Sequence, residues 1–203
     1  MRTPDGQIYE GDLKKYDESP DTTHFSVIDS KGNAVSNTYT LGSSFGSGVT
    51  IKKGGFLMNN QMRNFSHFYG RDDMQYGTSE ANKLEPGKRM ISTQTPTLIF
   101  NPNGDLFMIL GSPGGGRIPN IITQVISNVI DHEMSFTEAV IAPRINQRLE
   151  GNLQLETGFS PDTISLLIDR GHKVESSNTM GSVQAIFLDQ GNIFGVADTR
   201  RPG

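Results

Sequence analysis

The short turns between β-prone runs constrain the fold of this chain more than any other feature. Three stretches each hold two such runs around a polar segment that contains glycine: residues 23–41 around 30–33, 95–112 around 101–104, and 183–198 around 190–192. Turns of this length and composition join antiparallel strands, whereas parallel strands need a crossover of about a dozen residues or more. We therefore expect antiparallel hairpins. In the second of them both runs are almost wholly apolar, which predicts strands that are buried on both faces.

Helix signals occupy the region between the second and third hairpins. Residues 119–134 carry apolar side chains at helical spacing on one face. The segment "SFTEAVIAP" has Ser135 as an N-cap and Glu138 at the capping-box position, and "SPDTISLLIDRG" has Ser160 as an N-cap followed by Pro161. An order of strands, then helices, then strands predicts an α+β fold, in which helices pack over antiparallel sheet, rather than a doubly wound fold.

The composition argues against several classes of function. The 203-residue chain has a formal net charge of −4, so we expect no nucleic-acid partner. It has no cysteine, which excludes disulfides, a thiolate nucleophile and cysteine metal sites. His24, His67 and His172 are scattered without the spacing of metal ligands, so we expect neither a metal site nor a cofactor. No run of 18 apolar residues is present, so a membrane-spanning helix is not expected.

The glycine-rich segment "GSPGGGR", Gly111 to Arg117, follows an apolar strand and precedes a helix. Consecutive glycines let backbone N–H groups converge on one point, and a helix N-terminus adds positive potential. Such a segment can bind a phosphate or an oxyanion, although it lacks the Lys-Ser/Thr of a P-loop. The local pattern is equally compatible with a plain glycine-rich turn.

Thr22 begins the first β-prone run, and its residue type alone predicts only a strand. A threonine hydroxyl is a poor nucleophile until a base takes its proton. A free α-amine, with a pKa of about 8, can act as that base only where the threonine is the first residue of its chain. Here other residues precede Thr22. Its hydroxyl can still attack the carbonyl of Asp21 and release Thr22 as a new N-terminus.

Five motifs in a fixed order carry a resemblance to a known family. They are "TTHFSVIDSKGNAVSNTYTL", "FGSGV", "LMNNQMRNFS", "PGKRMISTQTPT" and "GSPGGGRI". From about Thr22 to Arg201 the chain resembles the small subunit of γ-glutamyltransferase (γ-glutamyl transpeptidase), and "DTRRPG" resembles the end of that subunit. The resemblance implies the N-terminal nucleophile hydrolase fold, an αββα sandwich of two stacked antiparallel sheets between helix layers. This chain would form the small-subunit half of it.

The resemblance also implies roles for individual residues in the reaction. Thr22 would be the nucleophile, released by self-cleavage between Asp21 and Thr22, and its new amine would act as the base. Thr40 would hydrogen-bond the Thr22 hydroxyl. Gly114 and Gly115 would supply the oxyanion hole.

Substrate contacts follow from the same resemblance. Ser92 and Thr93 match a serine pair that holds the α-carboxylate of the substrate, and Gln61 and Asn64 match residues around its α-amino group. Asn64 stands where the family commonly has an acidic residue, so a charge-assisted bond to the substrate ammonium is lost. Gly42 stands where a polar side chain such as asparagine is usual.

The implied reaction is transfer or hydrolysis of glutathione-like γ-glutamyl amides, with water, an amino acid or a peptide as acceptor. Residues 1–21 would be the tail of a large subunit, and residues 22–203 the small-subunit catalytic domain. A glutaryl or cephalosporin-type acylase is an alternative because of Asn64, and an inactive fragment without its large subunit is another. The large subunit is the expected partner, and pairing with a second copy of the chain is possible. The family resemblance implies a periplasmic or secreted location.

Overall fold

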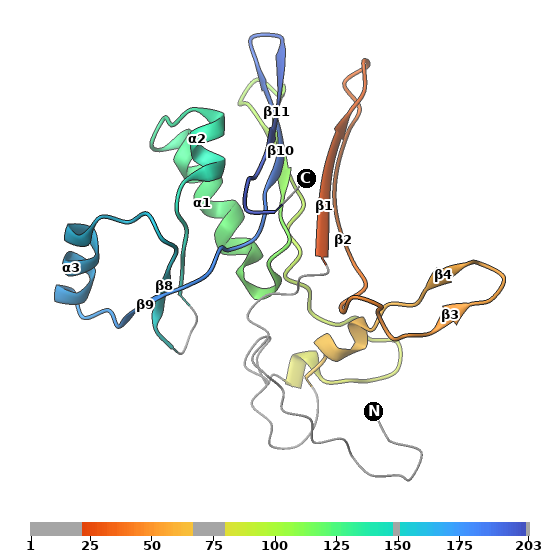
Figure 1. Cartoon of the computed structure of the whole chain (residues 1–203). Coiled ribbons are helices and arrows are strands. Elements are labelled where there is room, and N and C mark those ends of the chain that lie inside the picture. Colours follow the sequence, from red (N-terminus) through yellow and green to blue (C-terminus); the bar gives the residue numbers. More distant parts are fainter. Residues whose placement is uncertain (1–21, 67–79, 148–150, 202–203) are drawn as a thin grey trace.

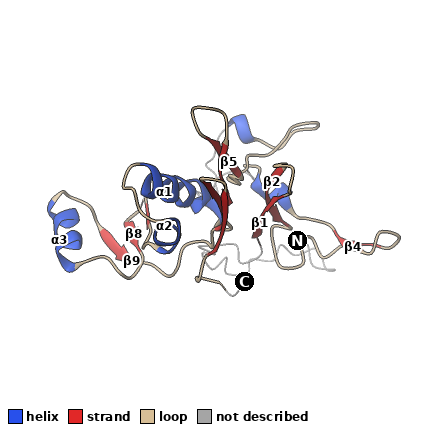
Figure 2. Cartoon of the chain, turned by 90° about the horizontal axis from the view of Figure 1, so that it is seen from above, coloured by secondary structure: helices blue, strands red, loops and turns tan. Residues whose placement is uncertain are grey.

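Residues 22–66, 80–147 and 151–201 are described by the structure, a computed structural model. A four-stranded sheet forms the middle of three layers, with helices on one face and a two-stranded hairpin on the other (Figure 1, Figure 2). The predicted segment 1–21, with Asp21, lies outside the described residues, as does His67. Within the described ranges, no helix is long and apolar enough to cross a membrane.

The first predicted hairpin is confirmed as β1 (Thr22–Ile28) paired with β2 (Ala34–Thr40). At its turn the Asp29 carboxylate accepts the backbone N–H groups of Lys31 and Asn33, at 2.8 and 2.9 Å. These bonds fix the turn and, with it, the strand register.

The second and third predicted hairpins are confirmed, and they join into one antiparallel sheet. Its order is β11-β10-β6-β5. The strands are β5 (Thr97–Phe100), β6 (Leu106–Gly111), β10 (Gln184–Asp189) and β11 (Asn192–Ala197). The pairing of β6 with β10 places Met108 beside Phe187 in the centre of the sheet.

Two helices, α1 (Ile118–Ile130) and α2 (Phe136–Ile141), cover one face of this sheet. Met108 and Phe187 pack with Ile121 in the buried core, and each fully buried side chain of this size contributes about 1.5–3 kcal/mol. The predicted capping box at the start of α2 is present. The first helix ends earlier than predicted, at Ile130, which is already 52 % exposed and no longer faces the core.

The hairpin β1–β2 lies on the other face of the sheet and contacts it through small polar side chains. Ser26 Oγ donates to the carbonyl of Gln184 at 3.1 Å, and Ser36 Oγ donates to that of Leu110 at 3.0 Å. The outer face of the hairpin is apolar and about half exposed, at Phe25, Val27, Val35 and Tyr39. Helices, sheet and stacked hairpin confirm the predicted α+β class, and the apolar outer face is where a further layer would pack.

One expectation about burial is wrong. The apolar strand β5 was predicted to be buried on both faces, but Leu98 is 40 % and Phe100 is 56 % exposed. The reason is its position, because β5 is the edge strand of the sheet and, within the described part of the chain, pairs with β6 alone. Strand β6, which is paired on both sides, is buried as predicted from Met108 to Gly111.

The remaining elements flank these layers. Strands β3 (Thr50–Ile51) and β4 (Phe56–Leu57) form a short antiparallel pair, so the strand predicted around Phe56 is only two residues long. A small sheet contains β7 (Ile145–Asn146), β8 (Leu153–Leu155) and β9 (Val174–Ser176). Helix α3 (Pro161–Asp169), capped by Ser160 as predicted, connects β8 to β9. That crossover makes β8 and β9 parallel, an exception to the predicted antiparallel pairing.

Candidate active site

Thr22 and Thr40 lie directly opposite each other at the open end of the hairpin β1–β2. Opposite residues on antiparallel strands have Cβ atoms about 4.5–5.5 Å apart, so the two hydroxyls are within reach of each other. Thr22 is buried. Thr40 Oγ1 accepts the backbone N–H of Gly42 at 2.9 Å, a bond that does not use the Thr40 hydroxyl proton. The hydrogen bond between the two hydroxyls stays a prediction.

The glycine segment connects β6 to α1 through a 3-10 turn, Gly115–Arg117. Gly114 and Gly115 have φ of 141° and 55°, a backbone region that side chains other than glycine rarely adopt. Pro113 lines the same groove as Thr22, so the loop lies next to the start of β1. Buried glycines at the start of a helix are suited to present N–H groups to an oxyanion.

Thr93 is attached to this glycine loop. Its Oγ1 donates to the carbonyl of Gly115 at 2.8 Å. Ser92 is exposed, and its Oγ accepts the backbone N–H of Gln94 at 3.2 Å, which leaves its proton outside that bond. Of the predicted pair, Ser92 is therefore better placed to donate to a carboxylate, because the Thr93 proton is used by the protein.

Gln61 and Asn64 belong to one 3-10 turn, Gln61–Asn64, and Asn64 Nδ2 donates to Gln61 Oε1 at 2.8 Å. The turn lies against Gly42, where a Cβ would collide with the side chain of Asn60. The amide oxygen of Asn60 is buried and has no hydrogen-bond partner among the described residues. The Asn60 amide thus fills the space where a side chain at position 42 would begin, and the side chains gathered here, Asn60, Gln61 and Asn64, are amides rather than carboxylates.

Asn82 joins the two halves of the predicted substrate site, a role that no local sequence pattern indicates. It is 5 % exposed. Its Nδ2 donates to the carbonyl of Asn64 at 2.7 Å, and its Oδ1 accepts the backbone N–H of Ile91 at 2.9 Å. Because Ile91 precedes Ser92 directly, one buried amide connects the turn predicted to bind the α-amino group with the segment predicted to bind the α-carboxylate.

His24 follows Thr22 by two residues and lies on the same face of β1. It belongs to a second polar network, which no sequence motif predicts. It is 4 % exposed, and it leaves no space for a Cβ at Gly111 of β6. Its Nδ1 is 2.8 Å from Thr38 Oγ1 and its Nε2 is 3.2 Å from Ser26 Oγ. Ser26 gives its own proton to backbone carbonyls of the sheet, so the Nε2–H donates to Ser26, and Nδ1 accepts from Thr38. Burial lowers the pKa of His24 to about 4, which keeps the ring neutral near pH 7.

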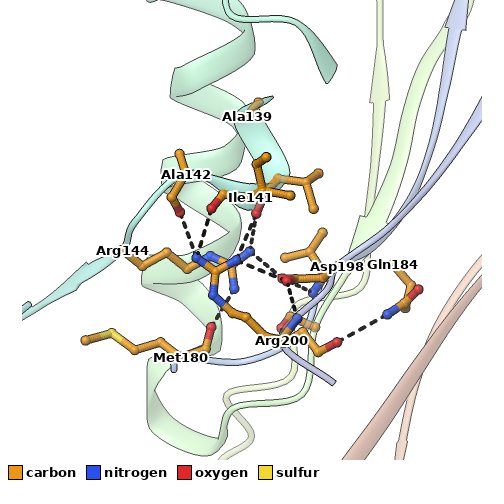
Figure 3. A network of polar contacts seen from close by, with 12 residues as sticks. Ala139, Ile141, Ala142, Arg144, Met180, Gln184, Asp198 and Arg200 are labelled. Atoms are coloured by element: carbon orange, nitrogen blue, oxygen red, sulfur yellow. Dashed lines mark hydrogen bonds and ion pairs between the residues drawn. The ribbon is translucent and has the colours of Figure 1, made fainter. Parts of the chain in front are cut away.

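A buried ionic cluster fixes the C-terminal segment (Figure 3). Asp198 Oδ2 lies 2.7 Å from Arg144 Nη2, and Arg200 Nη2 lies 2.6 Å from Glu156 Oε2. Arg200 also pairs with Asp198 at 3.0 Å. Burial alone would raise the pKa of Asp198, but the charge of Arg144 and the hydrogen bond from the backbone N–H of Val183 lower it on balance. Arg144, Glu156, Asp198 and Arg200 are named the C-terminal clamp below.

The predicted site residues therefore form a continuous arrangement. Thr22 faces Thr40, and Thr40 bonds to Gly42 beside Gln61 and Asn64. Asn82 and Thr93 complete the connection to Gly115. A hydroxyl, glycine N–H groups and a polar rim are the parts that acyl transfer needs. Among the described residues, no three histidine or carboxylate side chains are grouped to hold a metal ion.

Comparisons with known proteins agree on one family. The sequence profile described as Gamma-glutamyltranspeptidase matches residues 2–203. A glutathione hydrolase proenzyme of Escherichia coli (strain K12) is 42 % identical over 201 residues, which cover 97 % of this chain and 34 % of the relative. The Acylase ACY 1 proenzyme of Pseudomonas sp. (strain SE83) is 39 % identical over 188 residues, 92 % of this chain and 32 % of the relative.

A solved structure extends the likeness to three dimensions. It is an acivicin-inhibited gamma-glutamyltranspeptidase whose C-terminus has critical roles in autoprocessing and catalysis. It is 40 % identical with a TM-score of 0.81, over 89 % of this chain and 100 % of that chain. The chain thus spans about a third of the length of the two curated relatives above, but the whole of this solved chain.

Proposed function

The chain belongs to the gamma-glutamyltranspeptidase family, and from this premise we propose that it is the nucleophile-bearing part of an enzyme that transfers or hydrolyses γ-glutamyl amides through an ester on Thr22. The observation that carries the proposal is the continuous arrangement from Thr22 through Thr40 to the turn Gln61–Asn64. Its parts come from distant segments of the chain, and only the fold brings them together.

Maturation comes first in the proposed sequence of events. Thr22 Oγ attacks the carbonyl carbon of Asp21 and forms an ester bond, the peptide C–N bond breaks, and the hydroxyl proton passes to the departing nitrogen. Water then hydrolyses the ester between Asp21 and Thr22 and leaves a free amine on Thr22. In the uncleaved chain that nitrogen is an amide and cannot act as a base, so cleavage creates the catalytic base.

Catalysis then uses the new amine. The neutral amine takes the hydroxyl proton while Oγ attacks the γ-carbonyl carbon of the donor, and this proton passes to the departing amine. Backbone N–H groups of Gly114 and Gly115 stabilise the oxyanion. Ser92 holds the α-carboxylate, and Gln61 and Asn64 contact the α-amino group. Water or an acceptor amine resolves the ester.

The partner in this proposal is the part of the proenzyme that precedes Thr22 in family members. The relatives matched are about three times as long as this chain. The exposed apolar face of β1–β2, at Phe25, Val27, Val35 and Tyr39, is the surface that such a partner would cover. Because the C-terminus of a relative is critical for autoprocessing and catalysis, we assign a similar importance to the C-terminal clamp here.

A matched pair of variants tests the nucleophile. In the proenzyme that contains this chain, Thr22→Ala removes the hydroxyl, whereas Thr23→Ala removes a hydroxyl from the opposite, exposed face of β1. We expect wild type and Thr23→Ala to lose everything before Thr22, as seen by intact mass, and to release nitroaniline from γ-glutamyl-p-nitroanilide. Thr22→Ala should do neither. Turnover by cleaved Thr22→Ala would refute the assignment, and a wild type that never cleaves would favour an inactive fragment.

A second candidate function is a glutaryl or cephalosporin-type acylase. The neutral Asn64 favours it, because a donor without an α-ammonium gains nothing from a carboxylate at that position. The acylase relative is nearly as similar to this chain as the glutathione hydrolase. Initial rates with γ-glutamyl and glutaryl anilides, which differ only in the ammonium, decide between the two. A higher kcat/KM for the glutaryl donor would identify an acylase.

A further inference from the structure

Arg201, at the C-terminal end of the described chain, contacts the first residue of β1. Its Nη1 donates to the carbonyl oxygen of Thr22 at 3.2 Å, across 179 positions of sequence. Both residues line one groove, of about 590 Å³, that runs along β1 and the strands β10 and β11. The contact therefore lies at the proposed nucleophile, and it is made by a side chain to which no role in the site has been assigned above.

The C-terminal clamp explains why Arg201 is held there. The backbone N–H of Arg200 donates to Asp198 Oδ1 at 3.0 Å, and the Arg200 side chain binds Glu156 and the carbonyl of Ala142 at 2.8 Å. Asp198 also accepts the backbone N–H of Val183 at 2.9 Å. The residues directly before Arg201 are thus fixed to three other segments, and its guanidinium reaches Thr22 from a rigid base.

An anchor at this carbonyl matters most after cleavage. Among the described residues β1 pairs with β2 on one side only, and on the groove side the Arg201 guanidinium binds the Thr22 carbonyl. Cleavage before Thr22 would make it a chain terminus, and terminal residues fray unless they are tied down. A displacement of about 1 Å at a reacting group can cost about a hundredfold in rate.

We propose that Arg201 is a positioning residue for the nucleophile: it binds the Thr22 carbonyl so that the hydroxyl and the new amine of the terminal residue stay aligned with Gly114 and Gly115. This inference rests on the proposed function. It adds a specific contact by which the C-terminal segment acts on the reacting residue.

The charge of Arg201 gives the proposal a second consequence. Among the described residues lining the groove, only Arg201 and His24 carry titratable groups; the neighbours from β10, β11 and the glycine loop are Gln184, Ala197 and Pro113. His24 is neutral near pH 7, and none of the described residues that line the groove is a carboxylate. A guanidinium beside the Thr22 amine disfavours the ammonium form and so lowers the pKa of that amine. A larger fraction of the amine is then neutral and able to act as the base.

The test compares Arg201→Gln, Arg201→Lys and the control Arg170→Gln in the processed enzyme that contains this chain. Arg170 is an exposed arginine at the end of α3. We expect Arg201→Gln to lower kcat about tenfold and to move the acid limb of the kcat/KM profile upward by about one pH unit. Arg201→Lys should keep the limb in place, because the charge remains, yet lose part of kcat. Arg170→Gln should match wild type.

A second readout does not depend on turnover. An aminopeptidase should remove Thr22 from the cleaved chain faster in Arg201→Gln than in wild type, because the terminal residue is no longer held. Mass spectrometry measures the rate of this removal. This inference alone would be overturned if Arg201→Gln is cleaved, keeps the acid limb of the wild-type kcat/KM profile and loses Thr22 to the aminopeptidase at the wild-type rate. A wild-type proenzyme that does not cleave before Thr22 would overturn the inference and the proposed function together.

Discussion

Thr93 donates its hydroxyl proton to the carbonyl of Gly115, at 2.8 Å. The bond ties the segment that is predicted to hold the substrate carboxylate to the loop that is predicted to hold the oxyanion. Both segments would have to move together if either moved. A threonine that supports the glycine loop has a different role from one that grips the substrate, and the two roles can be separated by experiment.

Thr93→Val removes the hydroxyl at nearly constant shape. We expect kcat to fall about fivefold, because loss of a bond worth about 1 kcal/mol loosens the loop. Since the proton is used on Gly115, the loss should be equal for donors with and without an α-carboxylate. Thr93→Ser should restore activity. A loss confined to donors with the carboxylate would instead show that Thr93 grips the substrate.

Local sequence signals accounted for the elements but not for the contacts that assemble the site. The turn chemistry around Asp29 predicts the hairpin, and the hairpin register places Thr22 opposite Thr40. No local pattern predicts that Asn82 bonds to Asn64 and Ile91, because the segments meet only through the tertiary fold. The same holds for Arg144 and Asp198, which lie 54 positions apart in sequence.

Residue type likewise predicted some roles and missed others. The spacing of histidines along the chain indicates whether they can bind a metal. It cannot predict that a single ring, such as that of His24, is buried between two sheets and bound by hydroxyl groups. The apolar run of β5 predicted burial on both faces, but burial also depends on whether a strand is at the edge of its sheet, as Phe100 shows. The glycines at 114 and 115 were recognisable, since positive φ angles select glycine.

Asn82→Ala should separate the two halves of the substrate site. The carbonyl of Asn64 and the N–H of Ile91 would both lose a buried partner, at a cost of about 3 kcal/mol in the free energy of unfolding. We expect KM to rise along with this loss. Asn152→Ala removes an exposed amide that bonds to Glu175 and should cost less than about 1 kcal/mol. Denaturant unfolding and donor titration measure both effects, and equal costs for the two variants would contradict the bridging role.

Asn64→Asp should restore a charge beside the substrate ammonium. We expect kcat/KM for a γ-glutamyl anilide to rise about tenfold and that for the glutaryl anilide to fall, because only the first donor carries an ammonium. Asn192→Asp adds the same charge at the exposed start of β11 and should change neither rate. Equal changes for both donors would show that position 64 does not face the α-amino group.

His24 should make folding stability depend on pH between about 6.5 and 4. Burial lowers its pKa to about 4, whereas the unfolded chain has a histidine pKa of about 6.5. Between these values the unfolded state binds a proton that the folded state does not, so the free energy of unfolding falls as the pH falls. We expect a loss of roughly 2 kcal/mol, after allowance for solvent screening. His24→Gln should remove this slope in urea unfolding, whereas the exposed His172→Gln should keep it.

Breaking the C-terminal clamp should cost far more than breaking an exposed ion pair. Glu156→Gln removes the charge that faces Arg200 at 2.6 Å, where both side chains are less than a tenth exposed. Arg200 keeps its pair with Asp198 in this variant, so we expect a cost of about 3 kcal/mol, the lower end of the range for a broken buried pair. Glu85→Gln makes the same change in the exposed pair with Lys88 at 3.6 Å, which is worth at most about 1 kcal/mol. Urea unfolding of the two variants measures the difference. Similar midpoints would mean that the hydrogen bonds of Asp198 and Arg144 hold the C-terminal segment without Glu156, since those bonds remain in the variant.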